Sequence, residues 1–584
     1  MKKYLYILLA FVPMMWTACN LLDQPPYDDF TDEEFWQSEA QARSYMYGFY
    51  TSVFSGYGSG WSHGPFLMGQ TLNDDFASDK LQQDLQPTVV PVSDGSWSFS
   101  NIRKANYVIA NVGRLPLGDK DIAHWSGVAR FFRACYYSNL VFTYGDVPWY
   151  DRVPTVSNDP DEQAYLFKDR DPRTYVDSLI MADFKYAMEN VRENDGQLQV
   201  NRYVVAAMAS RMMLREGTFL KYHQIDLERA ADCLQFAFDA AEMVMNSGKY
   251  SIAPSYKALF VSDDLAGNPE MIMYRHYVDG VLSHSTLSYT FTETQAGLSK
   301  SLADAFVNAD GVPVYVKEQL WTPRTEEEFF ADRDPRLTQV IRPHYYVKGT
   351  DCSPFAYALS GLSWCKFMDD SRASNPEPTW ASNKNVIDAP CLRYAEVLLN
   401  YVEAAYELSL LGKYTFTQAD LDKSINLIRD RADVNLPHLQ LMGGQPAVNG
   451  VPYDDPRRLD IEVMADGGIT PSMLWEIRRE RRVELCLEGF RLNDLKRWRK
   501  LDYLWNECNP DIRYGAYIVL ANYPTKDDEI VLDDPLATEG YILRNTEGGR
   551  KRPEAKNYIA PIPSGQITLY ESKGFKLTQN KEWQ

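Results

Sequence analysis

The segment 121–144 constrains the fold most, because it is a helix-length run that is apolar on more than one face. Gly145 follows it as a C-cap, and Asp-Val-Pro148 then blocks continuation of the helix. A helix that is apolar on several faces has to be covered by neighbours on more than one side. The sequence therefore predicts a body in which helices pack against helices.

Other segments with helical periodicity extend this scaffold. Consecutive pairs are separated by short turns, which favours stacked antiparallel hairpins, but the period of about 34 residues that marks a tetratricopeptide array is not clear. Between 250 and 390, and again over 505–584, short stretches rich in Gly, Pro, Ser and aromatics predict long irregular insertions with a few short strands. The further predicted helices are 97–112, 172–192, 201–219, 226–246, 391–410, 417–432 and 471–488.

The N-terminus has the pattern of a secretory signal. Two lysines precede an apolar run that ends at Trp16, which is shorter than the ~20 residues of a membrane-spanning helix. The ending Thr-Ala-Cys19 resembles a bacterial lipobox, although Trp16 stands where such boxes usually carry an aliphatic residue; an ordinary secretory signal is the alternative. We predict a signal peptide over 1–18, lipidation of Cys19 and a proline-stiffened tether over 19–30.

Charge argues against nucleic acid as a partner. The formal net charge is −20, so the body is repelled by nucleic acid and by anionic membrane surfaces, and a membrane link falls to the lipid on Cys19. The densest charge run, 478–500, interleaves its arginines with Glu480, Glu484, Glu488 and Asp494. These helical spacings predict ion pairs within and between helices.

No catalytic or cofactor motif is present in the sequence. It lacks Walker, GxGxxG, GxSxG and HExxH patterns, so we do not predict an enzyme. A glycosidase would need two carboxylates held across one bond, which a sequence cannot display. No cofactor is indicated, and a structural calcium ion, although compatible with the chain, has no motif here.

The cysteines form no regular framework. Cys135, Cys233, Cys391 and Cys486 fall within helical patterns and are predicted to be small buried side chains. Cys352 and Cys365 lie in a loop-rich region of an exported chain, where they could form a disulfide or remain free.

Short motifs follow one another along the whole chain, and together they resemble one family. They are Thr31-x3-Phe35-Trp36, Ile102-x3-Asn106, Arg130-Phe-Phe-Arg-Ala, Tyr144-Gly-Asp-Val-Pro148, Cys391-Leu-Arg-Tyr-Ala-Glu-Val-Leu-Leu-Asn-Tyr-Val-Glu-Ala404, Ile425-Asn-x-Ile-Arg429, Glu480-Arg-Arg-x-Glu-Leu-x-x-Glu-Gly-x-Arg491-x-x-Asp-Leu-x-Arg-Trp498, Pro561-Ile-Pro563 and Leu577-Thr-Gln-Asn580. In this order, and behind a lipidated start, they resemble the SusD/RagB family of outer-membrane lipoproteins.

The resemblance implies a mainly α-helical body over 31–584, with TPR-like helical hairpins as the scaffold. It divides this body into an N-terminal helical part (31–250), a loop-rich insertion (251–390) and a C-terminal part (391–584). It also implies exposure on the outer membrane, a SusC-like TonB-dependent transporter as partner, and binding of oligosaccharides without catalysis. A peptide-binding relative is the alternative, followed by a glycoside hydrolase.

In such a binder, aromatic side chains pack on sugar rings while amides and carboxylates bond hydroxyl groups, and the scaffold holds these residues on loops. Each candidate could instead pack its own loop, whereas Trp36, Trp97 and Trp498 lie on helical patterns and are expected in the core. The predicted ligand-binding residues are Trp61, Asn73, Asp75, Tyr289, Trp321, Trp364 and Trp380.

Overall fold

The structure, a computed structural model, describes residues 35–64, 73–78, 89–155, 157–288, 296–318, 321–370, 382–523, 530–544 and 550–584. Cys19, Tyr289 and Trp380 lie outside these ranges, so their predicted roles stay predictions. Within these ranges, every helix is too short or too polar to cross a membrane.

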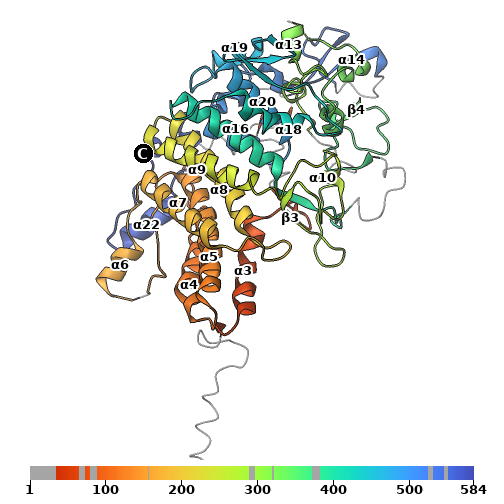
Figure 1. The fold of residues 1–584 in the computed structure, drawn as a ribbon. Helices are drawn as coiled ribbons and strands as arrows, with labels where there is room; N and C mark the ends of the chain where they lie inside the picture. Colours follow the sequence, from red (N-terminus) through yellow and green to blue (C-terminus); the bar gives the residue numbers. More distant parts are fainter. Residues whose placement is uncertain are drawn as a thin grey trace, which may run out of the picture.

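The first half of the chain builds a stack of long helices (Figure 1). They are α3 (Glu39–Val53), α4 (Ser100–Asn111), α5 (Asp119–Tyr144), α7 (Arg173–Asn190), α8 (Arg202–Tyr222) and α9 (Leu227–Met245), joined later by α16 (Tyr394–Leu410). Helix α5 packs between α4 and α7, α8 packs between α7 and α9, and α16 packs against α8 and α9. The predicted helical scaffold with few short strands is confirmed.

Helix α5 is enclosed as its sequence predicts. Phe131, Phe132, Tyr137 and Val141 are all fully buried although they point in different directions around the helix. Gly145 ends it with φ +76°, a conformation that glycine adopts at little cost, and its N–H donates to the carbonyl of Val141 at 2.8 Å.

Three predicted helices in the C-terminal part have different bounds. Residues 389–393 form strand β6 before α16 begins, so Cys391 lies in a strand rather than a helix. The segment 417–432 is interrupted at Ser424, whose hydroxyl donates to backbone carbonyls of the preceding turn, which yields α17 (Gln418–Asp422) and α18 (Ile425–Arg429). Helix α20 (Ser472–Glu484) ends early and leaves Cys486 in the following turn.

The remaining elements are antiparallel strand pairs, short helices and loops. The strands are β1 (Gly58–Ser59) with β2 (Ser62–His63), β3 (Met271–Arg275) with β6 (Ala389–Arg393), β4 (Ile341–Tyr345) with β5 (Leu362–Trp364), β10 (Tyr514–Val519) with β11 (Glu539–Leu543), and β7 (Gln440–Met442), β8 (Gln445–Val448) and β9 (Val451–Pro452) in one sheet. The short helices are α6 (Pro160–Leu166), α10 (Ala258–Val261), α12 (Lys300–Ala303), α13 (Val314–Lys317), α14 (Glu326–Phe330), α15 (Arg336–Val340), α19 (Pro456–Glu462), α21 (Arg491–Arg497) and α22 (Ser564–Ser572). Single 3₁₀ turns cover Val112–Arg114, Leu501–Leu504, Pro510–Arg513, Leu520–Asn522, Ala555–Tyr558 and Lys581–Trp583.

A buried network of ion pairs joins β6, α15, α18 and α20. Arg393, at the end of β6, contacts Glu270, Glu484 and Glu488 at 3.0, 2.6 and 2.7 Å. Arg431 contacts Glu270 and Glu484 at 2.6 Å each, and none of these side chains is more than 3% exposed. The network continues through Arg336, Lys366, Arg429 and Glu480.

Glu484 is the hub of this network, since three arginines contact its carboxylate. Burial alone would raise its pKa, but Arg431, Arg393 and Arg336 outweigh burial and lower the pKa to about 2. The charge run 478–500 therefore makes ion pairs, as predicted from its spacing.

The thiols of Cys352 and Cys365 are free, so the structure contains no disulfide between them. Cys365 is buried and its thiol lies 3.6 Å from the carbonyl of Gln339, whereas Cys352 is half-buried and contacts the carbonyl of Val347 at 3.5 Å.

Candidate functional site

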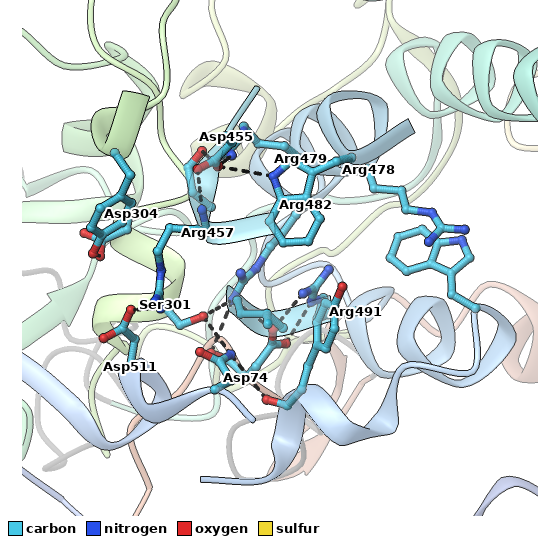
Figure 2. A pocket seen from close by; sticks show the side chains of 17 residues that line it. Asp74, Ser301, Asp304, Asp455, Arg457, Arg478, Arg479, Arg482, Arg491 and Asp511 are labelled. Carbon is cyan, nitrogen blue, oxygen red and sulfur yellow. Dashed lines mark hydrogen bonds and ion pairs between the residues drawn. The ribbon is translucent and has the colours of Figure 1, made fainter. Parts of the chain in front are cut away.

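Charged residues line a pocket of about 70 Å³ where α12, α19, α20 and α21 meet (Figure 2). Figure 2 shows Arg482 and Arg491 converging on Asp74, with ion-pair distances of 3.2 and 2.6 Å. Arg479 pairs in the same way with Asp455 across the pocket. The charges that line the pocket are thus largely satisfied by one another.

Asn73 and Asp75, two predicted ligand-binding residues, flank Asp74 and are buried with it. Asp75 is 1% exposed and pairs with Arg482 at 2.9 Å, while Oδ1 of Asn73 accepts a hydrogen bond from the Asp75 N–H at 2.9 Å. Burial raises the pKa of Asp75, whereas for Asp74 the neighbouring guanidinium groups outweigh burial and hold the pKa at about 2. Both predicted residues are therefore bonded within the protein.

The size of this pocket argues against a glycan site. Small-molecule sites usually enclose ~300–1,000 Å³, and about 70 Å³ has room for a few water molecules only. Because its arginines and aspartates are paired, we interpret the pocket as a junction that holds α12, α19, α20 and α21 together.

Trp61 has the opposite environment. It occupies the two-residue turn of the β1–β2 hairpin, and 55% of its surface is exposed. Gly60 precedes it with φ +56°, as a tight hairpin turn requires, and donates its N–H to the carbonyl of Ser283 at 2.8 Å. The backbone is thereby fixed while the indole ring stays accessible.

The base of this hairpin is buried in an aromatic cluster. Tyr57 packs against Tyr277, His284 and Phe367, with ring centroids 6.4, 4.9 and 5.4 Å away. Burial lowers the pKa of His284 to about 3, so its imidazole is neutral, and Nε2 donates to the carbonyl of Ile387 at 3.0 Å. A rigid base therefore carries an exposed aromatic ring, which is a suitable arrangement for stacking on a flat ligand.

The hairpin 57–63 adjoins two further segments, the turn 277–288 and the segment 382–388. We call the surface of these three segments the Trp61 face. His284 pairs with Asn385 through two backbone hydrogen bonds of 3.0 and 2.9 Å, which ties the second segment to the third. The turn 278–282 also exposes Val281, at 82%.

The other predicted tryptophans have different positions. Trp364 lies in β5, is 2% exposed and packs on Phe367, so the prediction of a loop position for it is wrong. Trp321 is half-buried, with the guanidinium of Arg333 5.5 Å from its ring centroid. Of the predicted residues that the structure describes, Trp61 alone presents most of its side chain to solvent.

One group of side chains has the composition of a metal site. Ligand atoms of Asp264, His276 and Asp388 lie within 4.8 Å of one another. The buried carboxylate of Asp388, however, already bonds Nδ1 of His276 at 2.8 Å and accepts from the N–H groups of Tyr277 and Leu265 at 3.0 and 2.9 Å. The carboxylate of Asp388 and the imidazole of His276 are therefore already bonded within the protein.

Comparison with known proteins identifies relatives along most of the chain. A family model described as the SusD family matches residues 269–583. SusD-like protein P2 of Formosa agariphila is 21% identical over 524 residues, which cover 85% of this chain and 91% of that protein.

Solved structures share the fold. A SusD-like carbohydrate-binding protein from Bacteroides fragilis superposes with a TM-score of 0.65 at 21% identity, covering 92% of this chain and 99% of that one. Surface glycan-binding protein A from Bacteroides fluxus superposes with a TM-score of 0.57 at 16% identity, covering 93% and 99%. At these identities the similarity establishes the architecture, including the helical stack and the loop-rich half.

Proposed function

The chain belongs to the SusD family, and on this premise we propose that it is an outer-membrane lipoprotein that captures oligosaccharides at the cell surface without catalysis. It passes them to a SusC-like TonB-dependent transporter. Relatives of the same fold are described as carbohydrate-binding and glycan-binding proteins, which supports the ligand class.

The observation that carries the proposal in this chain is the Trp61 face. Trp61 is 55% exposed on a hairpin whose backbone is fixed by hydrogen bonds. The apolar face of a sugar ring buries such an indole without requiring the protein to reorganise, so little binding free energy is lost to ordering.

Titration calorimetry against oligosaccharides of different linkage and charge tests the ligand class. We expect saturable binding of at least one glycan and no release of reducing ends during the measurement. Failure with every glycan, together with saturable binding of peptides, would transfer the proposal to the peptide-binding alternative. Turnover of a glycan would contradict binding without catalysis.

The membrane link is tested separately through Cys19. If the cysteine carries the lipid, Cys19→Ala removes the attachment and the chain moves from the membrane fraction to the soluble fraction, because the acidic body has no attraction for anionic headgroups. Cys352→Ala serves as the matched control and leaves the distribution unchanged. A Cys19→Ala variant that still sediments with membranes would refute lipid anchoring through this residue.

A further inference from the structure

A second cleft, of about 510 Å³, lies where the ends of α5 and α8 and the start of α7 meet the segments 555–559 and 578–584. Its volume falls within the ~300–1,000 Å³ of small-molecule sites, unlike the pocket of Figure 2. Residues of the Trp61 face do not line it. Arg170, Arg173 and Arg499 line it, so we call it the basic cleft, although the guanidinium of Arg173 is already paired with Glu216.

Arg499 adopts a backbone conformation that favours glycine. It lies at the C′ position after α21 and has φ +57°. The N–H of Arg499 donates to the carbonyl of Lys496 at 3.2 Å, and the N–H of Lys500 donates to the carbonyl of Leu495 at 2.7 Å. This is the Schellman motif, whose C′ residue is usually glycine. An arginine here places a guanidinium in the cleft at the expense of backbone strain, and such strain concentrates at functional sites.

The guanidinium of Arg499 has no ion pair or side-chain hydrogen bond among the described residues, although it lines the cleft. The carboxylates nearby have other partners: Asp146 accepts from the backbone N–H of Arg173 at 2.8 Å and offsets part of the charge of Arg170, and Asp466 pairs with Arg552 at 3.1 Å. Glu582 and Lys581 offset each other's charge on the exposed rim. The donors of Arg499 therefore remain available to a ligand.

Further positive charge surrounds Arg499. Arg170 donates to the carbonyls of Asp146 and Gln579 and to the amide oxygen of Asn580; it forms no direct ion pair among the described residues, although the carboxylates of Asp146 and Asp169 offset part of its charge. Lys496, on α21, donates to the carbonyl of Phe142 at 3.2 Å, but burial together with Arg173 and Arg215 lowers its pKa to about 7, so it adds only part of a charge at neutral pH. Among the described residues that line the cleft, Arg170 and Arg499 are thus the arginines without a direct ion pair, which in a chain of formal net charge −20 favours an anionic ligand at this place.

His223 adds a neutral acceptor to the wall of the cleft. Burial, together with Arg173, Arg499 and Lys496, lowers its pKa to about 3, so the imidazole carries no charge at neutral pH. Its Nε2 donates to the carbonyl of Lys496 at 3.0 Å, which leaves Nδ1 as an acceptor suited to a hydroxyl group. A cation beside a neutral acceptor matches an acidic group and a hydroxyl on one small molecule.

We propose that the basic cleft is a second ligand site, which binds the carboxylate or sulfate group of a sugar acid through Arg499. An arginine fork accepts the two oxygens of such a group in one plane, which gives both strength and orientation. A free inorganic anion such as sulfate would bind Arg499 through the same contacts, so the experiment compares a sugar acid with an inorganic anion. The site is independent of glycan capture at the Trp61 face.

Calorimetric titration of the full chain with sodium glucuronate, glucose and sodium sulfate at constant ionic strength tests the proposal. We expect saturable binding of glucuronate and weaker binding of sulfate, with none of glucose. Arg499→Gly weakens glucuronate binding by roughly 10-fold or more, as expected for the loss of a charged hydrogen bond. Glycine suits the left-handed backbone, so this variant melts at the wild-type temperature or above it.

Asn449→Gly is the matched control, since Asn449 also has a left-handed backbone (φ +52°) but lies in the turn between β8 and β9 and carries no charge. It leaves glucuronate binding unchanged, as does Trp61→Ala, which separates this site from the Trp61 face. Equal affinity of wild type and Arg499→Gly, equal binding of glucose and glucuronate, or no saturable binding of either anion would overturn the proposal. Binding of sulfate without glucuronate would refute the sugar acid as ligand.

Discussion

The buried ion-pair network and the Trp61 face use their residues in opposite ways. Arg393, Glu484 and Glu488 belong to the motifs by which the sequence resembles its family, and each is buried and bonded to its neighbours. Trp61 belongs to none of these motifs, and its ring is mostly exposed. The comparison teaches that the shared motifs supply buried side chains that hold β6, α15, α18 and α20 together, while the exposed aromatic that we propose for glycan binding lies outside these motifs.

The largest expected effect comes from breaking the network. Arg393→Leu removes one guanidinium from Glu270, Glu484 and Glu488 at once and leaves these buried carboxylates with only part of their compensation, from Arg431, Arg336 and Lys366. Loss of one partner of a buried ion pair costs ~3–5 kcal/mol of unfolding free energy. Urea denaturation followed by circular dichroism measures this change.

The matched control is an arginine in an exposed pair. Arg229 contacts Asp232 at 3.2 Å on the surface of α9, and exposed helical pairs of this kind contribute ~0.2–0.5 kcal/mol. Arg229→Ala therefore lowers the unfolding free energy only slightly. Equal losses for Arg393→Leu and Arg229→Ala would contradict a structural role for the network.

The second prediction, of intermediate size, concerns how the unfolding free energy depends on pH, and it compares His223, at the end of α8, with His284, in the Trp61 face. Burial lowers the pKa values of His223 and His284 from 6.5 to about 3. Below pH 6.5 the unfolded chain therefore binds protons that the folded chain does not, so stability is complete above pH 6.5 and declines as the pH falls toward 3. Each histidine should remove about 2 kcal/mol by about pH 5.

Unfolding free energies measured in steps from pH 7.5 to 5 test this expectation. His223→Phe and His284→Phe should each halve the loss of unfolding free energy between pH 7.5 and pH 5, whatever their effect on stability at pH 7.5. A slope that neither variant changes would show that the two imidazoles are not buried in the neutral form.

Much of the helical scaffold could be predicted from the sequence because helical periodicity is a local signal. The start of α16 was missed since β6 depends on pairing with β3, a partner far away in the chain. Ser424 breaks a helix that its apolar spacing otherwise supports. These errors arise where tertiary contacts or a single side-chain hydrogen bond override the local pattern.

The site was harder to predict. Loop composition marks Trp61 and Trp364 equally, but only packing decides that the first is exposed and the second buried. Asn73 and Asp75 look like ligand contacts until Arg482 is brought against them from α20. The basic cleft has no local signal at all, because its residues come from distant segments and the strain at Arg499 exists only in the folded backbone.

The most direct test of this account measures glycan affinity and thermal stability together for Trp61→Ala and Tyr175→Ala, with the glycan that the wild type binds. Tyr175 is a comparable exposed aromatic, at 51%, but lies on α7 in the helical stack. We predict that Trp61→Ala weakens binding by roughly 10-fold or more at an unchanged melting temperature, as the loss of a stacked aromatic implies, and that Tyr175→Ala alters neither quantity. Wild-type affinity in Trp61→Ala would contradict the assignment of glycan capture to the Trp61 face.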